Sequence, residues 1–209
     1  MARIDLSMPL DEGTPAFPGD PVFRSRRVRS LEKDGGYNLS ILELGSHTGT
    51  HVDPPLHFVA DGLPVDRLDL GQLNGPCQVL SVPPSVRRIG PSELSAVARG
   101  TERLLLKSSN SERWASRLAF FADYVALDLD GAKRLRQLGV RLIGIDSLSI
   151  EADATGSFPV HRDLLSHGVA IVEGLLLSDA PSGPAEFACL PLRIKGGDGG
   201  PARAVLSTP

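Results

Sequence analysis

The sequence predicts an α/β fold in which a few helices pack on a mixed β-sheet, within a single domain that spans residues 1–209. Apolar segments of strand length recur along the chain, whereas helical patterns are few. Two of the helical patterns come directly before an apolar strand, which is typical of βαβ units. A length of 209 residues, of which 41% are hydrophobic and 22% charged, suits one ordinary globular domain.

Eight segments are predicted as strands because they are apolar, short and bounded by turn residues. They are Val22–Ser30, Asn38–Gly45, Cys77–Val82, Arg103–Lys107, Arg141–Asp146, Val169–Leu175, Phe187–Ile194 and the shorter Arg203–Ser207.

Three segments are predicted as helices, namely Pro91–Ala98, Asp130–Leu138 and Val160–Ser166. Gly139 and Gly168 follow the last two, and glycine readily adopts the left-handed conformation that ends a helix. The glycine-rich stretch 196–200 follows a strand, but no helix comes after it. It is therefore predicted as a hairpin turn and not as a nucleotide-binding loop.

The charge balance excludes several classes of partner. Lys and Arg total 22 against 25 Asp and Glu, so the net charge is -3 and no basic stripe is expected for nucleic acid or a membrane surface. Cys77 and Cys189 lie far apart and outside any CxxC pair, which predicts reduced thiols. The apolar stretch 169–177 contains an acidic residue and is too short for a membrane span, and the first residues form no apolar leader. We expect a cytoplasmic protein that acts on a small molecule.

Three of the five histidines fall between residues 47 and 57, together with Asp53. On a helix His47 and His51 would share a face but Asp53 would point away from both, and two prolines prevent the helix from continuing. In a straight strand the two histidines would be about 13 Å apart. Gly49 lies midway between them and can supply a bend. The segment therefore predicts a strand end and a tight loop that turn two imidazoles and a carboxylate inward.

Such a cluster is more consistent with a metal or catalytic site than with a polar surface loop. Imidazole and carboxylate together suit Zn(II), Mn(II) or Fe(II), and the spacing alone does not choose among them.

A second candidate is Glu173, an acidic residue within an apolar strand, which is costly to bury unless it is paired or binds a metal. A salt bridge to an arginine is an equally good interpretation of this residue alone. His161 begins a short helix twelve residues earlier, and a helix followed by a returning strand can bring the two side chains into one site. Asp146 is interpreted as structural, and His167 as a residue at a helix C-terminus without a chemical role.

The segment 47–58, His-Thr-Gly-Thr-His-Val-Asp-Pro-Pro-Leu-His-Phe, resembles the HxGTHxDxPxHF signature of the cyclase family of metal-dependent hydrolases. That family includes bacterial kynurenine formamidase and isatin hydrolase. The resemblance extends over nearly the whole chain, through residues 14–20, 142–147, 190–192 and 201–205.

The resemblance implies a swivelling β/β/α fold, found as dimers or tetramers, with a site for two divalent ions. The ions would be zinc, with manganese as an alternative. His57 would be the general acid/base and Asp53 would bridge the two ions. The implied metal ligands are His47, His51, Asp53, His161 and Glu173.

The expected reaction is hydrolysis of an aryl formamide by metal-activated water, with N-formylkynurenine converted to kynurenine and formate. In bacterial kynurenine formamidases a Trp generally precedes Pro-Gly-Asp and forms part of the substrate pocket, whereas Phe17 stands here. They also tend to have Thr-Pro-Ser where this chain has 147–149, Ser-Leu-Ser.

Three alternatives remain open. One is a hydrolase that opens a cyclic amide or lactone such as isatin. Another is a non-haem Fe(II) oxygenase, because His51, Asp53 and the distant His161 imitate an HxD…H triad. That triad would leave His47, His57 and Glu173 without roles. The last is a metal-binding protein without catalytic activity.

Overall fold

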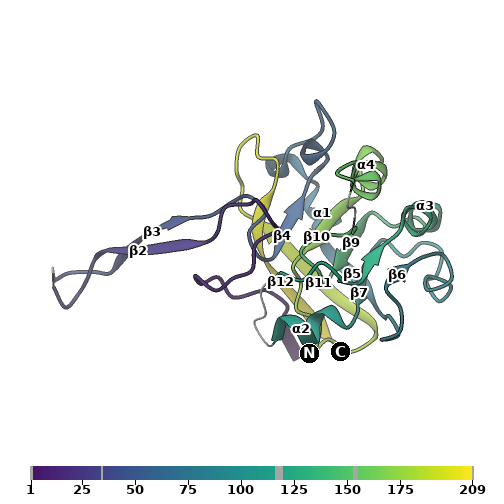
Figure 1. Cartoon of the computed structure of the whole chain (residues 1–209), viewed down its shortest axis with the longest axis horizontal. Coiled ribbons are helices and arrows are strands. Elements are labelled where there is room, and N and C mark those ends of the chain that lie inside the picture. The colour runs from purple at the N-terminus through teal and green to yellow at the C-terminus, as the bar shows by residue number, and fades with distance from the viewer. Residues whose placement is uncertain (1, 34, 116–119, 153–154, 209) are drawn as a thin grey trace.

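The computed structural model describes residues 2–33, 35–115, 120–152 and 155–208, and its centre is an eight-stranded mixed sheet (Figure 1). In spatial order the strands are β1 (Ala2–Asp5), β12 (Gly200–Thr208), β11 (Gly183–Pro191), β5 (Asn74–Ser81), β7 (Arg103–Lys107), β9 (Leu142–Ile145), β10 (Ala170–Glu173) and β4 (His51–Asp53). Strands β5, β7, β9 and β10 are parallel to one another, whereas the remaining pairings are antiparallel. The predicted α/β class with a mixed sheet is confirmed.

The sheet curls so strongly that β4 pairs with both β10 and β12. Val52 faces Val172 on one side and Gly200 on the other. This closure leaves the three residues of β4 fully buried. It also places the short strand next to the end of β10, where Glu173 and His51 are register partners.

Three of the parallel strands, β7, β9 and β10, are buried on both sides, which explains their nearly continuous apolar sequences. Leu104, Ile143 and Ile171 belong to the core that contains residues of helices α3 (Leu129–Leu138) and α4 (Pro159–Ser166). Their neighbours Leu105 and Leu142 belong to the core on the other side, within the curled sheet. Consecutive side chains of a strand point to opposite faces, so each strand contributes to both cores.

The predicted helix ends and the glycine-rich turn are confirmed. Gly139 ends α3 with a φ of 94° and donates its N–H to Arg136 and Leu135 carbonyl oxygens. Helix α4 ends at Ser166, His167 is its C-cap residue, and Gly168 follows with a φ of 72°. Residues 192–199 connect the antiparallel strands β11 and β12, as expected for a hairpin.

The predicted helix Pro91–Ala98 is wrong, because this segment consists of turns. Its N–H groups bond three residues back, from Ser95 to Ser92 and from Val97 to Leu94. Leu94 and Val97 are buried and anchor these turns in the core. An apolar spacing of three residues suits a series of turns as well as a helix, so the pattern did not distinguish the two.

Several short elements were not predicted as such. They are α1 (Leu70–Leu73), α2 (Asn110–Ala115), the 3-10 turns η1 (Pro55–His57) and η2 (Val65–Arg67), β1, β4, and the pair β6 (Arg88–Ile89) and β8 (Ala126–Leu127). Among the described residues no helix has the length and apolarity needed to cross a bilayer.

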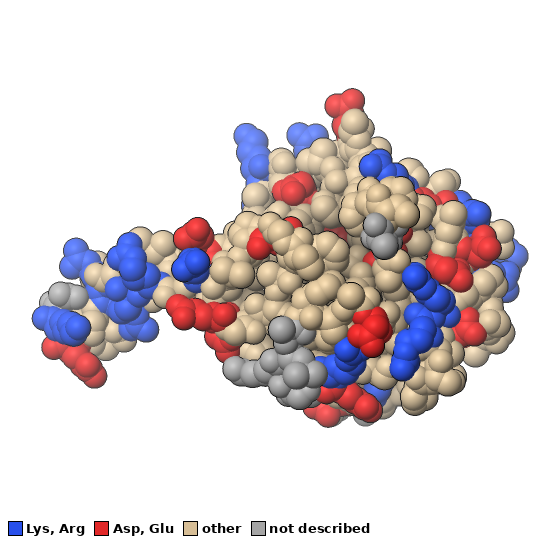
Figure 2. All heavy atoms as spheres, viewed as in Figure 1, with Lys and Arg blue, Asp and Glu red and all other residues tan. Residues whose placement is uncertain are grey.

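The predicted strands Val22–Ser30 and Asn38–Gly45 exist, but they form a separate hairpin and not part of the main sheet. This hairpin consists of β2 (Arg24–Arg29) and β3 (Leu39–Glu43), which pair only with each other among the described strands. It projects from the body as an arm (Figure 1), and Figure 2 shows Lys and Arg side chains gathered along it. We call residues 24–43 the arm.

Candidate metal centre

The bend that the sequence predicted between His47 and His51 is present at Gly49. Its φ is 64°, a left-handed conformation that favours glycine. The bend brings the two imidazole rings to a centroid distance of 5.0 Å at nearly right angles, far closer than a straight strand allows. A second glycine, Gly174 at the end of β10, allows the bend to approach this strand, because a Cβ there would lie 2.3 Å from the Gly49 carbonyl oxygen.

Asp53 lies at the centre of the cluster and is fully buried. Its Oδ1 is 2.8 Å from His47 Nδ1 and 3.3 Å from His51 Nε2. Its Oδ2 is 3.9 Å from His161 Nε2. One carboxylate thus touches the histidine-rich loop on one side and helix α4 on the other.

Glu173 joins the same cluster, and its partners are not arginines. Its Oε1 accepts the N–H of Ile150 at 2.6 Å and lies 3.1 Å from His161 Nε2. Its Oε2 lies 3.4 Å from His51 Nε2. The expectation that α4 and the following strand bring His161 and Glu173 together is therefore confirmed, whereas the salt bridge to an arginine is absent among the described contacts of Glu173.

His57 lies beside this cluster in the η1 turn. Its ring stacks on that of His47 with a centroid distance of 3.9 Å. Among the described residues, no hydrogen bond joins its ring nitrogens to a carboxylate. Burial lowers the pKa of His57 below its ordinary value of 6.5, although Asp53 opposes this shift.

The charges in the cluster favour a cation. Burial by itself lowers the pKa of His51, but Asp53 and Glu173 outweigh it and raise the pKa to about 10. His161 behaves in the same way, since Glu151 and Glu173 raise its pKa to about 10. A negative potential that retains protons on buried imidazoles also attracts metal ions.

The side chains present fit a divalent metal ion. Asp53 Oδ2 is buried without a hydrogen-bond partner among the described residues, and such an orphaned oxygen is normally satisfied in a folded protein. There are two groups of three residues in which the ligand atoms lie within 4.8 Å of one another, and Asp53 belongs to both groups. The groups are His47, Asp53 and His57, and His51, Asp53 and Glu173. Mixed nitrogen and oxygen donors of this kind suit zinc, manganese or iron.

The cluster opens into a cavity of about 330 Å³, a size that suits a small ligand. Phe17 lies on its wall and packs edge-to-face against Phe120, with ring centroids 5.4 Å apart. Phe58 and Phe158 line the same cavity, so an apolar aromatic wall faces the polar cluster. The full lining is Pro15, Phe17, Pro18, Asp20, His47, His51, His57, Phe58, Leu148, Ser149, Phe158, His161 and Glu173.

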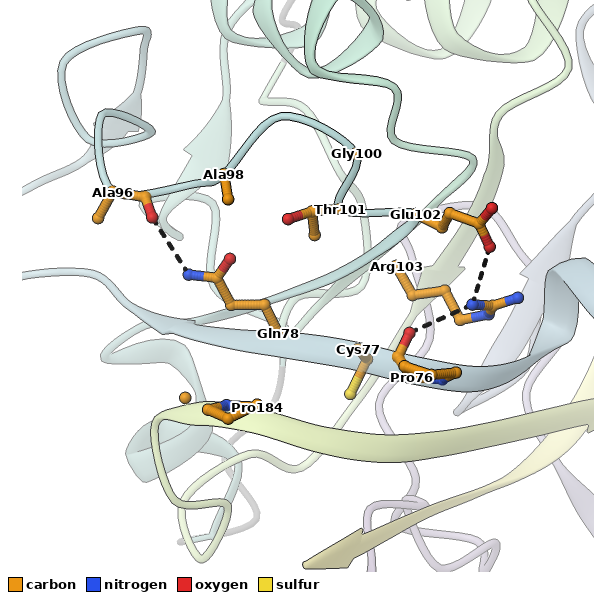
Figure 3. A pocket seen from close by; sticks show the side chains of 11 residues that line it. Pro76, Cys77, Gln78, Ala96, Ala98, Gly100, Thr101, Glu102, Arg103 and Pro184 are labelled. Atoms are coloured by element: carbon orange, nitrogen blue, oxygen red, sulfur yellow. Dashed lines mark hydrogen bonds and ion pairs between the residues drawn. The ribbon is translucent and has the colours of Figure 1, made fainter.

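A larger cavity of about 610 Å³ lies elsewhere, between β5, β11 and the segment 96–103 (Figure 3). Its Cys77 is an inert thiol, because burial raises the pKa to about 12. The guanidinium of Arg103 is already bonded to the carbonyl oxygens of Gly71, Gln72 and Pro76. This cavity is larger than the one beside the Asp53 cluster, but none of its described lining residues offers a reactive group.

Two further acids contact the cluster without having been singled out from the sequence. Glu151 Oε1 lies 2.6 Å from His161 Nδ1, and Asp198 Oδ2 lies 3.4 Å from His47 Nε2. Glu151 lies in the loop between β9 and α4, and Asp198 lies in the glycine-rich turn. Glu151 lies ten residues before His161, and Asp198 lies 151 residues after His47. Neither acid stands in a metal-ligand pattern of the sequence, so these contacts become visible only in the folded chain.

The two residues without an assigned chemical role are placed as expected. Asp146 is buried and accepts hydrogen bonds from the backbone and hydroxyl groups of Ser108 and Ser111. His167 is exposed at the C-terminal end of α4. Neither makes a described contact with the cluster.

Comparisons with known proteins show the family to which this chain belongs. The sequence profile of the Cyclase family matches residues 4–152. The chain is 37% identical over 204 residues to the kynurenine formamidase of Geobacillus thermodenitrificans (strain NG80-2), a match that covers 97% of this chain and 96% of the relative.

Solved structures show the same fold. A predicted metal-dependent hydrolase from Bacillus stearothermophilus is 32% identical, with a TM-score of 0.84 over 98% of this chain and 97% of that one. An isatin hydrolase bound to the product analogue thioisatinate has a TM-score of 0.87 over 99% and 92% of the chains, and its 20% identity supports the fold alone. The profile match and the full-length relative show that this chain belongs to the Cyclase family of proteins.

Proposed function

We propose that the protein is a metal-dependent hydrolase of aryl formamides that converts N-formylkynurenine to kynurenine and formate. The observation that carries this proposal is the buried cluster around Asp53, whose unpartnered oxygen faces imidazole and carboxylate ligands beneath an aromatic cavity. The similarity to kynurenine formamidase over nearly the full length supports the choice of substrate.

We propose that the site holds two Zn(II) ions, with Mn(II) as an alternative. His47, His51 and Asp53 would hold one ion, and His161 and Glu173 the other, with Asp53 shared between them. When bound, such ions act as Lewis acids that polarise a carbonyl group and make water more acidic at neutral pH.

The side chains of this chain would supply binding and proton transfer. Phe17, Phe58 and Phe158 offer flat apolar surfaces on which the aryl ring of a substrate can stack, and they exclude water from that part of the cavity. His57 lines the same cavity and is free to take a proton from the attacking water, or to deliver one to the leaving aniline nitrogen.

The same geometry argues against an oxygenase. A triad of His51, Asp53 and His161 would leave Glu173 and His47 idle, yet both lie within hydrogen-bond distance of members of that triad. A metal site without activity would need neither the cavity nor His57 on its wall.

The test is turnover of N-formylkynurenine compared with isatin, by zinc-loaded protein under anaerobic conditions. We expect kcat/KM for the formamide to exceed that for isatin by at least about tenfold, the difference that a few fitted apolar contacts produce. A preference for isatin would favour cyclic-amide opening instead. A strict need for Fe(II) and O₂ would establish an oxygenase, and metal uptake without turnover of either compound a binding protein.

We also infer that the protein assembles with further copies of itself, as a dimer or tetramer. The arm carries apolar side chains that are about half exposed, including Leu39 at 48%, Ile41 at 52% and Leu42 at 58%. A two-stranded hairpin on its own is only marginally stable, so these side chains need a cover.

A second copy of this chain is a suitable cover on grounds of charge. The arm contains five Lys and Arg against three Asp and Glu, a net charge of +2 in a chain of -3, which leaves -5 for the rest. The body also exposes apolar residues on and after β11, namely Leu190 and Leu192. Phe17 precedes the arm and His47 follows it, and both residues line the cavity. Assembly through the arm would therefore stabilise the cavity wall on both sides of the arm.

Light scattering after size exclusion tests this assembly. We expect the wild type to be larger than a monomer at micromolar concentration, and Ile41→Ser combined with Leu42→Ser to shift it toward monomer. Leu70→Ser is the control, because Leu70 is 68% exposed on α1 but lies outside the arm. A monomeric wild type, or an oligomer that the arm variant leaves intact, would contradict the inference.

A further inference from the structure

Glu151 lies outside the histidine-rich segment, yet its carboxylate holds His161 at two points. Oε1 accepts the backbone N–H of His161 at 2.9 Å and lies 2.6 Å from the ring Nδ1 of the same residue. Oε2 accepts the N–H of Val160 at 2.9 Å. The carboxyl group is buried, with only 3% of the residue exposed.

These contacts decide which ring nitrogen of His161 faces the cluster. Backbone N–H groups can only donate, so both carboxylate oxygens act as acceptors and His161 Nδ1 must be the donor. The other nitrogen, Nε2, points to Glu173 Oε1 at 3.1 Å and to Asp53 Oδ2 at 3.9 Å. Glu151 therefore selects Nε2 as the nitrogen that is available to a metal ion.

The same carboxylate also forms the start of the helix that carries His161. The residue before α4, Phe158, has a φ of 49° and provides no side-chain cap. Glu151 instead accepts the first N–H groups of the helix from a separate segment of the chain, and an anionic group is favourable at this end of a helix. Backbone and ring of His161 are thus oriented by one group.

We propose that Glu151 is a positioning residue of the metal centre, which orients the His161 ring and its tautomer for metal binding. This inference rests on the proposed role of His161 as a ligand, but not on the identity of the substrate. It makes Glu151 a determinant of metal affinity, although its carboxylate is directed to His161 and α4 and not to the ligand atoms of Asp53.

Asp146 provides a matched control within the same chain. It is equally buried, and it accepts backbone N–H groups at the start of another helix, from Ser108 and Ser111 next to α2. Its carboxylate has no described contact with the cluster. Replacing either acid by its amide removes one negative charge and disturbs a helix start, but only one of the two acids orients a ligand.

The experiment measures Zn(II) affinity by competition with a chromophoric chelator, and thermal unfolding of the metal-free proteins. We expect Glu151→Gln to weaken Zn(II) binding by about 10- to 100-fold, as loss of the partner of a metal-bound histidine typically does. Asp146→Asn should lower the Tm by a comparable amount and leave affinity within about twofold of wild type. The role would be overturned if Glu151→Gln bound Zn(II) with wild-type affinity. It would also be overturned if both variants lost affinity in proportion to their loss of Tm.

A measurement on the wild type covers the case in which Glu151→Gln does not fold. In zinc-loaded protein with ¹⁵N-labelled histidine, His161 should carry its proton on Nδ1 and show the shift of a metal-bound nitrogen at Nε2. The reverse pattern would overturn the proposal. Since no substrate is present, a wrong choice of substrate would leave both results unchanged, whereas a wild type that takes up no Zn(II) would refute the metal assignment and this role together.

Discussion

Glu173→Ala should reduce the metal content of the purified protein from two ions per chain to one or fewer. The carboxylate is buried and its oxygens lie within 3.4 Å of His51 and His161, so its removal takes away a ligand and the charge that attracts a cation. Activity should fall by more than the roughly 10- to 100-fold that loss of an outer partner costs. Elemental analysis of the dialysed variant gives the metal content directly.

The control for this variant is Glu186→Ala, which removes the same side chain from an exposed position on β11. It should retain full metal content and activity. Two ions per chain in Glu173→Ala would show that this residue only bonds to its neighbours within the protein. Loss of metal from both variants would point to a general loss of structure, which circular dichroism would reveal.

His57→Ala should have the opposite profile, with metal content and fold near wild type and a kcat lowered by about 10²- to 10⁴-fold. Pro54 and Pro55 stiffen the chain between Asp53 and His57, and the ring stacks on His47 at the edge of the cavity. From this place the imidazole can transfer protons without being needed to hold an ion. Metal analysis and steady-state kinetics on the same preparation separate the two functions.

The role of His57 in protonating the leaving group can be tested with a second substrate. The leaving group of an aryl ester is a phenol, which needs less protonation by an acid than an aniline nitrogen does. His57→Ala should therefore lose less activity on the ester than on the amide. Equal losses on both substrates would favour a positioning role. Loss of an ion would place His57 among the ligands, where its proximity to His47 and Asp53 makes it a reasonable candidate.

Local patterns were sufficient to predict the class of fold and most of the main sheet. Strand Arg103–Lys107 has the predicted bounds, and helix α3 with its glycine end differs by one residue. These elements depend on apolar periodicity and on the conformational freedom of glycine, which are properties of the chain itself. The prediction of a helix at 91–98 failed because an apolar spacing of three residues is common to helices and turns. The packing of Leu94 and Val97 in the core decided between the two.

The sequence by itself predicted a group of imidazoles and carboxylates that the fold brings together, and a bend at Gly49 between His47 and His51. It could not determine that Glu151 would orient His161, nor that the arm would leave the sheet. The first outcome depends on how the loop before α4 folds back onto that helix, and the second on the closure of the sheet through β4. The hydrogen-bond partners of a buried carboxylate are set by distances in the folded protein, and a local sequence pattern does not contain those distances.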